Sequence, residues 1–201
     1  MRSATLFLAC VIAATLHSAP RAASIAGGAH MPLTMMSARV SLDGTSNIRS
    51  FTASTPTVHL VVIEAGPVAG DVLDSVLQPG GLTALEVAIP AKGLTSPKEG
   101  VDKNMHKALR VEEFPNIRFR LRTMEPASGG YRAMGSLTIA GVERDVTLNL
   151  QAQRSGSALV VTATTDLLMT DYGIAPPTAL MGMLKTDPKV EIRIELVLEA
   201  S

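Results

Sequence analysis

The sequence is poor in cysteine and in aromatic residues, and each shortage excludes a class of protein. Cys10 is the single cysteine among 201 residues, so the chain has no pair of thiols for an internal disulfide. Aromatic residues make up 3% of the sequence, with no tryptophan, and surfaces that stack single-stranded nucleic acid depend on aromatic side chains. We therefore expect stability from an ordinary hydrophobic core and no nucleic-acid partner.

The chain also lacks an excess of charge of either sign. It has 18 basic and 18 acidic residues, so its formal net charge is zero. General attraction to phosphate backbones or anionic lipid surfaces needs a basic excess, which is absent here. Hydrophobic residues make up 46% of the sequence, as in ordinary globular proteins, and the length is sufficient for one domain with a substantial core.

The first 24 residues have the pattern of a secretory signal peptide. Arg2 precedes an apolar run at 6–16 that is too short to span a bilayer, and small residues at 22–24 offer a cleavage site. We predict export to the periplasm or the medium, with loss of Cys10. Residues 25–38 follow as a linker or a loose first segment, and a single domain is expected over residues 39–201.

Most of that domain alternates apolar and polar residues as strands do when one face is wet. Ile117, Phe119 and Leu121 alternate with arginines, which we expect to pair with carboxylates on neighbouring strands. The segments with a strand pattern are 39–51, 57–66, 82–94, 116–124, 131–150, 157–169 and 189–200. Helices between successive strands, which a parallel sheet requires, are missing. The pattern predicts a mostly β, antiparallel barrel or sandwich of about eight strands.

Three local features refine this prediction. Asp43-Gly44 reads as a turn between two short strands. Residues 96–114 contain the one clear helix, with Asp102 as its N-cap and Pro115 ending it. Gly141 marks the turn of a hairpin in which Met134, Leu137 and Ile139 precede it on one face, with Val146, Leu148 and Leu150 after it.

The residues that usually carry catalysis do not form a recognisable site. The sequence has no Gly-x-Ser-x-Gly motif and no glycine-rich phosphate loop between a strand and a helix. His59 lies in a strand and His106 lies on the helix beside lysines, which favours structural or solvated roles. No set of His and carboxylate residues has the spacing of a zinc site. We expect neither an enzyme nor a cofactor.

One methionine-rich stretch leaves a metal hypothesis open. His30, Met31, Met35 and Met36 lie close together, and thioethers with an imidazole suit cuprous copper in an exported protein. A linker that happens to contain methionine explains the same residues.

Three segments resemble the YceI-like family of exported bacterial proteins. They are 102–121, with its acidic-aromatic-proline junction at 113–115; the hairpin 135–150; and 164–174, with an Asp-aromatic-Gly turn, followed by the closing strand. The sequence departs from the family at Ser46-Asn47, where members often have His-Ser. The family consists of lipocalin-like barrels that bind polyisoprenoid lipids, so the resemblance implies a β-barrel with one or two short helices.

The resemblance also implies that the apolar strand faces line a lumen. That lumen would hold an isoprenoid or quinone-like chain for carriage or sequestration, with Tyr172 placing a hydroxyl near the head group. The predicted ligand contacts are Met105, Leu109, Phe114, Phe119, Leu137, Leu148, Met169, Tyr172, Leu180 and Met183. Transient membrane contact and a homodimer are compatible with this function. The alternative is an exported structural or stress-response domain with a filled core that acts through a protein partner.

Overall fold

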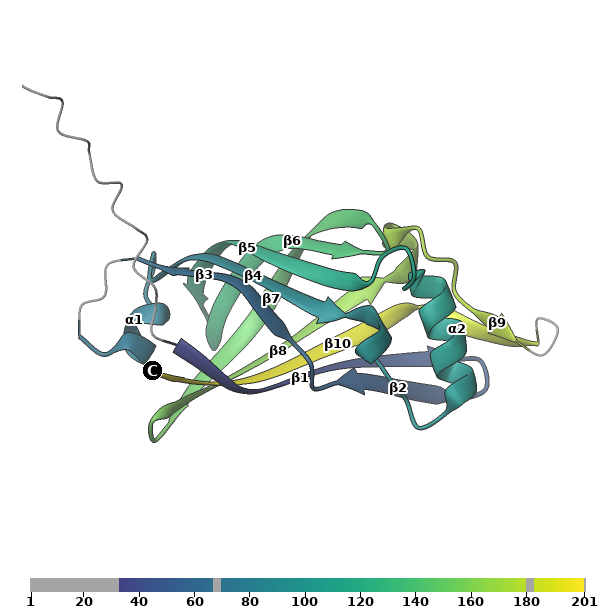
Figure 1. Ribbon diagram of the computed structural model, residues 1–201, viewed down its shortest axis with the longest axis horizontal. Coiled ribbons are helices and arrows are strands. Elements are labelled where there is room, and N and C mark those ends of the chain that lie inside the picture. Colours follow the sequence, from purple (N-terminus) through teal and green to yellow (C-terminus); the bar gives the residue numbers. More distant parts are fainter. Residues whose placement is uncertain (1–32, 67–69, 180–182, 201) are drawn as a thin grey trace, which may run out of the picture.

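The alternating segments form one antiparallel sheet that curls into an elongated half-barrel (Figure 1). The computed structural model describes residues 33–66, 70–179 and 183–200. Its strands are β1 (Leu33–Ser46), β2 (Ser50–Thr55), β3 (His59–Ala65), β4 (Leu82–Pro90), β5 (Asn116–Ala127), β6 (Gly130–Ile139), β7 (Val142–Ser155), β8 (Ala158–Leu168), β9 (Thr178–Ala179) and β10 (Leu184–Ala200). The predicted class, mostly β and antiparallel with few short helices, is confirmed.

The strand order within the sheet is β2-β1-β10-β8-β7-β6-β5-β4-β3, and β9 pairs with β10 off this path. From β4 to β8 each strand lies beside its predecessor in the chain. β10 returns between β8 and β1, with Ile194 opposite both Ala163 and Val40. β2 and β3 are therefore the two edges of the sheet.

Short helices lie at both ends of the half-barrel (Figure 1). α1 (Val72–Val76) lies between β3 and β4, whereas η1 (Ala91–Gly93) and α2 (Glu99–Leu109) connect β4 to β5. η2 (Met169–Tyr172) follows β8. In the view of Figure 1, α1 lies near the start of β1 and α2 lies across the opposite end, near β9.

The limits of α2 differ from the prediction. Lys98, not Asp102, is the N-cap, and the Asp102 Oδ1 atom accepts the Ser96 backbone N–H at 2.7 Å. This hydrogen bond links the first turn of α2 to the segment that precedes the helix. The helix ends before Pro115 is reached, because Arg110 adopts a left-handed conformation with a φ of 51°.

The predicted turn at Asp43-Gly44 is wrong. β1 continues to Ser46, and Gly44 lies directly opposite Phe51 of β2. A Cβ atom at Gly44 would collide with the Phe51 ring, so this glycine provides room for a cross-strand aromatic side chain instead of a turn. The chain turns at residues 47–49, after β1.

The sheet begins before residue 39, where the sequence placed the start of the domain. Residues 33–38 are the first part of β1 and pair with the end of β10, with Leu33 opposite Ala200. For these residues the structure shows the first strand and not a linker. Residues 25–32 and the predicted signal peptide at 1–24 lie outside the described residues.

The arginines of β5 pair with carboxylates on other strands: two pair with the neighbouring strand β4, as predicted, and one reaches across β6 to β7. Arg118 and Arg120 both contact Glu86 of β4, at 3.6 and 3.1 Å. Arg122 contacts Asp145 of β7 at 2.8 Å. These ion pairs lie on the outer face, so the apolar residues between them point into the half-barrel.

Candidate ligand-binding cavity

The inner face of the sheet surrounds a cavity of about 660 Å³. This volume lies within the range of roughly 300–1,000 Å³ that small-molecule sites usually occupy. β10 illustrates how the wall forms, because every second residue points inward: Val190, Ile192, Ile194, Leu196 and Leu198 all line the cavity. The interior is therefore open space and not a filled core.

The wall is almost entirely aliphatic. β4, β5, β7 and β8 each contribute alternate side chains, in the same way as β10. These side chains are Leu82, Leu85, Val87, Ile89, Ile117, Phe119, Leu121, Val146, Leu148, Leu150, Ala152, Leu159, Val161, Ala163, Thr165 and Leu167. Such a surface binds a ligand by removing its apolar area from water and has few polar groups to orient it.

α2 covers one end of the cavity. Val101, Met105 and Ala108, at helical spacing, line the cavity from this side. The helix is held in place by His106, whose Nε2 atom lies 2.8 Å from the Leu94 carbonyl oxygen. This contact gives His106 a structural role, in agreement with the sequence analysis.

The segment leading into α2 also pairs with the edge strand β2 at this end of the cavity. Thr95 and Ser54 of β2 form an antiparallel bridge with N–H to oxygen distances of 2.8 and 3.1 Å. The bridge therefore joins β2 to the chain that continues from β4 into α2.

α1 covers the opposite end, where Val76 and Leu77 line the cavity. Asp71 caps this helix by accepting the N–H groups of Leu73 and Asp74, at 2.9 and 3.3 Å. The short helix thus presents a buried apolar side to the lumen and a charged N-terminus to solvent.

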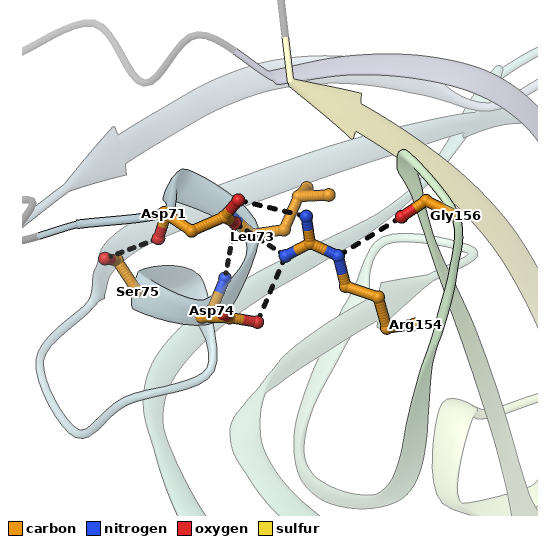
Figure 2. Close-up of polar contacts among 6 residues, drawn as sticks. All are labelled: Asp71, Leu73, Asp74, Ser75, Arg154 and Gly156. Carbon is orange, nitrogen blue, oxygen red and sulfur yellow. Dashed lines mark hydrogen bonds and ion pairs between the residues drawn. The ribbon is translucent and has the colours of Figure 1, made fainter.

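Arg154 of β7 joins this N-terminus to the sheet (Figure 2). Its guanidinium donates to both carboxylate oxygens of Asp71, at 2.6 and 2.9 Å, and to Asp74 Oδ1 at 3.1 Å. The hydrogen bond from Arg154 lowers the pKa of Asp71 to about 2, so the carboxylate stays charged at neutral and mildly acidic pH. These bonds hold α1 over the end of the cavity.

Most of the predicted ligand contacts lie together on the cavity wall. Those that line it are Met105, Leu109, Phe119, Leu137, Leu148, Met169 and Tyr172. Their contact with a ligand stays a prediction. Leu180 lies outside the described residues.

Phe114, Met183 and Met134 are placed elsewhere than expected. Phe114 packs its ring against Gly141 and under the Arg110 guanidinium, which lies 4.5 Å from the ring centre, so it covers the β6–β7 turn. Met183 is 69% exposed before β10. Met134 lies opposite Thr147 on the outer face, because the inward position of β6 belongs to Ala133.

Several lining residues were missed by the sequence analysis. Val40, Leu42 and Phe51 come from β1 and β2, where the wrongly placed turn concealed the alternation. Tyr131 and Ala133 come from the start of β6, where the expected face was shifted by one residue. Arg49 and Lys98 also line the cavity, and no local pattern could identify them because loop packing places them there.

Tyr172, which lines the cavity, carries a buried polar group. The residue is 3% exposed, and its hydroxyl has no hydrogen-bond partner among the described residues. Burial, and then the charge of Asp171, raises the pKa of Tyr172 to about 12, so the phenol is protonated and can donate. Buried hydroxyls are normally paired, so this one retains an unused donor beside the cavity wall.

The described residues contain no cluster of three or more His, Cys, Asp or Glu side chains that could hold a metal ion. His30 and Met31 of the copper hypothesis lie outside the described residues. Met36 is 57% exposed at a bulge of β1, next to the half-buried Met35. Within the same described part of the chain, no helix has the length and hydrophobicity needed to cross a membrane.

Solved structures with the same fold share little sequence with this chain. BcnA of Burkholderia cenocepacia superimposes with a TM-score of 0.65 at 14% identity, covering 80% of this chain and 95% of BcnA. A polyisoprenoid binding domain from Saccharophagus degradans, implicated in plant cell wall breakdown, gives 0.59 at 11% identity, covering 86% and 100%. The YceI protein of Campylobacter jejuni gives 0.54 at 15% identity, covering 76% and 82%.

The family follows from the sequence match. A comparison with curated proteins gives no match. The family described as the YceI-like domain matches residues 28–198, which include every described strand but the last residues of β10. The chain therefore belongs to the YceI-like family.

Proposed function

We propose that this protein is an exported, non-catalytic binding protein that holds an isoprenoid or quinone-like chain in its cavity, for carriage or sequestration. The observation that carries the proposal is the open, aliphatic cavity of about 660 Å³. The Saccharophagus degradans domain with the same fold is named for polyisoprenoid binding, which supports a ligand of this class.

The energetics suit a long hydrocarbon ligand. Each buried CH₂ group contributes roughly 0.8 kcal/mol, so a chain of several isoprene units can bind tightly through buried area alone. The aliphatic wall makes no demand on the position of double bonds or methyl groups along the chain. We therefore expect affinity to depend on chain length more than on the fine structure of the tail.

A lumen-filling substitution tests the proposal. Leu148 lines the cavity, whereas Thr147, its neighbour on β7, is exposed on the outer face. In Leu148→Trp the indole ring occupies the lumen. We expect at least about a tenfold loss of prenol affinity, equivalent to ~1.4 kcal/mol. Thr147→Trp adds the same ring outside and should bind as the wild type does.

The measurement is native mass spectrometry of the exported protein, followed by organic extraction and by titration of the delipidated protein with farnesol and longer prenols. A one-to-one lipid mass that is lost in Leu148→Trp and kept in Thr147→Trp supports the proposal. Failure of the delipidated wild type to bind any prenol, when purified without detergent, would overturn it.

A further inference from the structure

The charges that line the cavity are all of one sign. Arg49 and Lys98 are the charged residues among the described lining residues, and no carboxylate lines the cavity. Elsewhere the strands carry acidic and basic side chains in similar numbers on the outer face. The lumen thus combines a long apolar wall with cationic groups.

Arg49 and Lys98 lie at the same end of the cavity. Arg49 is in the turn before β2, and Lys98 is the N-cap of α2. The bridge between Ser54 and Thr95 is antiparallel, so the chain from Ser54 back to Arg49 runs alongside the chain from Thr95 on to Lys98. Both cations lie beyond the bridge, where Figure 1 shows the β1–β2 turn beside α2.

The backbone at both positions is fixed while the charged groups are unpaired. The Arg49 N–H donates to Ser46 Oγ at 3.1 Å, and the Lys98 N–H donates to Ser96 Oγ at 3.1 Å. Within the described ranges neither side chain forms an ion pair. Glu99, the nearest acidic residue in sequence, is exposed and does not line the cavity.

We propose that the ligand of this cavity is an amphiphile with an anionic head group, which Arg49 and Lys98 bind at the α2 end while the apolar tail lies along the lumen. A prenyl phosphate and a fatty-acid carboxylate share this chemistry. Charge-assisted hydrogen bonds from Arg and Lys to such oxygens are the stronger kind. The inference rests on the proposed function, because it requires the tail to occupy the cavity.

Matched ligands test the role of the charge. The delipidated protein is titrated with farnesyl phosphate and with farnesol, which share one tail, and with palmitate and hexadecanol as a second pair, all below their micelle concentrations. In the wild type we expect each anion to bind about tenfold more tightly than its alcohol. Raising the salt concentration should reduce the preference, because both cations are exposed.

Substitutions identify the residues responsible. Arg49→Gln with Lys98→Gln should lower the affinity for each anion to about that of its alcohol. The control is Lys103→Gln with Lys107→Gln, which removes two exposed charges from α2 that do not line the cavity. This control should keep the full preference.

The outcomes separate the two proposals. Equal binding of anion and alcohol by the wild type would overturn the head-group inference and leave the proposed function standing. A preference that survives in the Arg49/Lys98 variant would overturn the assignment to these residues. No binding of either tail would overturn both proposals. A preference for only one of the two pairs would assign the anion to that lipid class.

Discussion

At the scale of single residues, the hydroxyl group of Tyr172 links ligand binding to the stability of the fold. Its hydroxyl is buried, protonated and without a partner among the described residues, and the residue lines the cavity. An unpaired buried hydroxyl costs about 1–3 kcal/mol of folding free energy. A ligand acceptor atom in the cavity would remove this cost, so binding and stability are expected to respond to Tyr172 with opposite signs.

Replacing Tyr172 with phenylalanine measures both effects. We expect the free energy of unfolding of the empty protein to stay unchanged or to rise by up to about 1 kcal/mol, because the ring is kept and the unpaired group is lost. The affinity for oxygen-bearing prenyl ligands should fall by about three- to tenfold. Chemical denaturation and ligand titration are the measurements, with a hydrocarbon lacking oxygen as the control ligand. A loss of stability above about 1 kcal/mol would show that the hydroxyl is paired in solution.

At the scale of the elements, α1 is a five-residue helix that depends on its connection to β7. A helix this short is not stable alone. Leu73 and Val76 bury their side chains, and Arg154 binds the N-terminus through Asp71 and Asp74. The apolar contacts position α1 over the lumen, and the ion pairs determine how firmly its outer end is held.

The ion pairs set the pH dependence of this attachment. The pKa of Asp71 is lowered from 3.8 to about 2, so the folded state binds this proton less readily than the unfolded state. The contribution to stability is therefore present above about pH 4 and is lost as the pH falls through about 2. At neutral pH the attachment is insensitive to pH.

Arg154→Gln tests the attachment directly. We expect the pKa of Asp71, followed by NMR of the carboxyl group, to return toward its ordinary value, and the amide hydrogens of α1 to exchange faster. Arg132→Gln, which removes an exposed arginine from β6, should change neither observable. An unchanged pKa of Asp71 in the Arg154 variant would contradict the assigned cause.

The elements that sequence reasoning predicted well are those in which pairing and burial follow one simple period. The inward faces of β5 over 117–121 and of β10 over 190–198 were found, although β5 runs on to Ala127 and β10 already begins at Leu184. The errors lie where a residue that often marks a turn or a helix N-cap has a different role in the structure. Gly44 accommodates a ring across the strand, and Asp102 bonds backward to Ser96. At β6, the small Ala133 takes the inward position and the larger Met134 faces outward, which no hydrophobicity pattern predicts.

At the scale of the whole molecule, the protein has an open lumen between the walls of its sheet, with its buried clusters beside that lumen. Phe119, Leu121, Ala133 and Leu148 form a buried cluster in the sheet, but the facing walls are separated by the cavity. The dispersion contacts that would cross the interior are missing. The sequence could predict the apolar rows but not their separation, because the distance between walls depends on the curvature of the entire sheet.

A ligand that fills the lumen should therefore stabilise the fold. At a concentration one hundred times its dissociation constant, a ligand adds about 2.7 kcal/mol to the free energy of unfolding. For a domain of this size we expect the melting temperature to rise by about 5–10 °C. Differential scanning calorimetry with and without a prenyl ligand measures the shift. Leu148→Trp should show a much smaller shift, and an equal one would place the ligand outside the lumen.

The position of β1 also has a consequence for the order in which the protein folds. β1 is bonded to β2, which follows it directly, and to β10, which ends more than 150 residues after β1 begins. Pairing between distant segments carries a loop-closure cost and is slow. During synthesis β1 therefore remains without its β10 partner until the later strand has emerged. A chain truncated before β10 would leave β1 and β8 with unpaired edges, which are prone to pair with other chains.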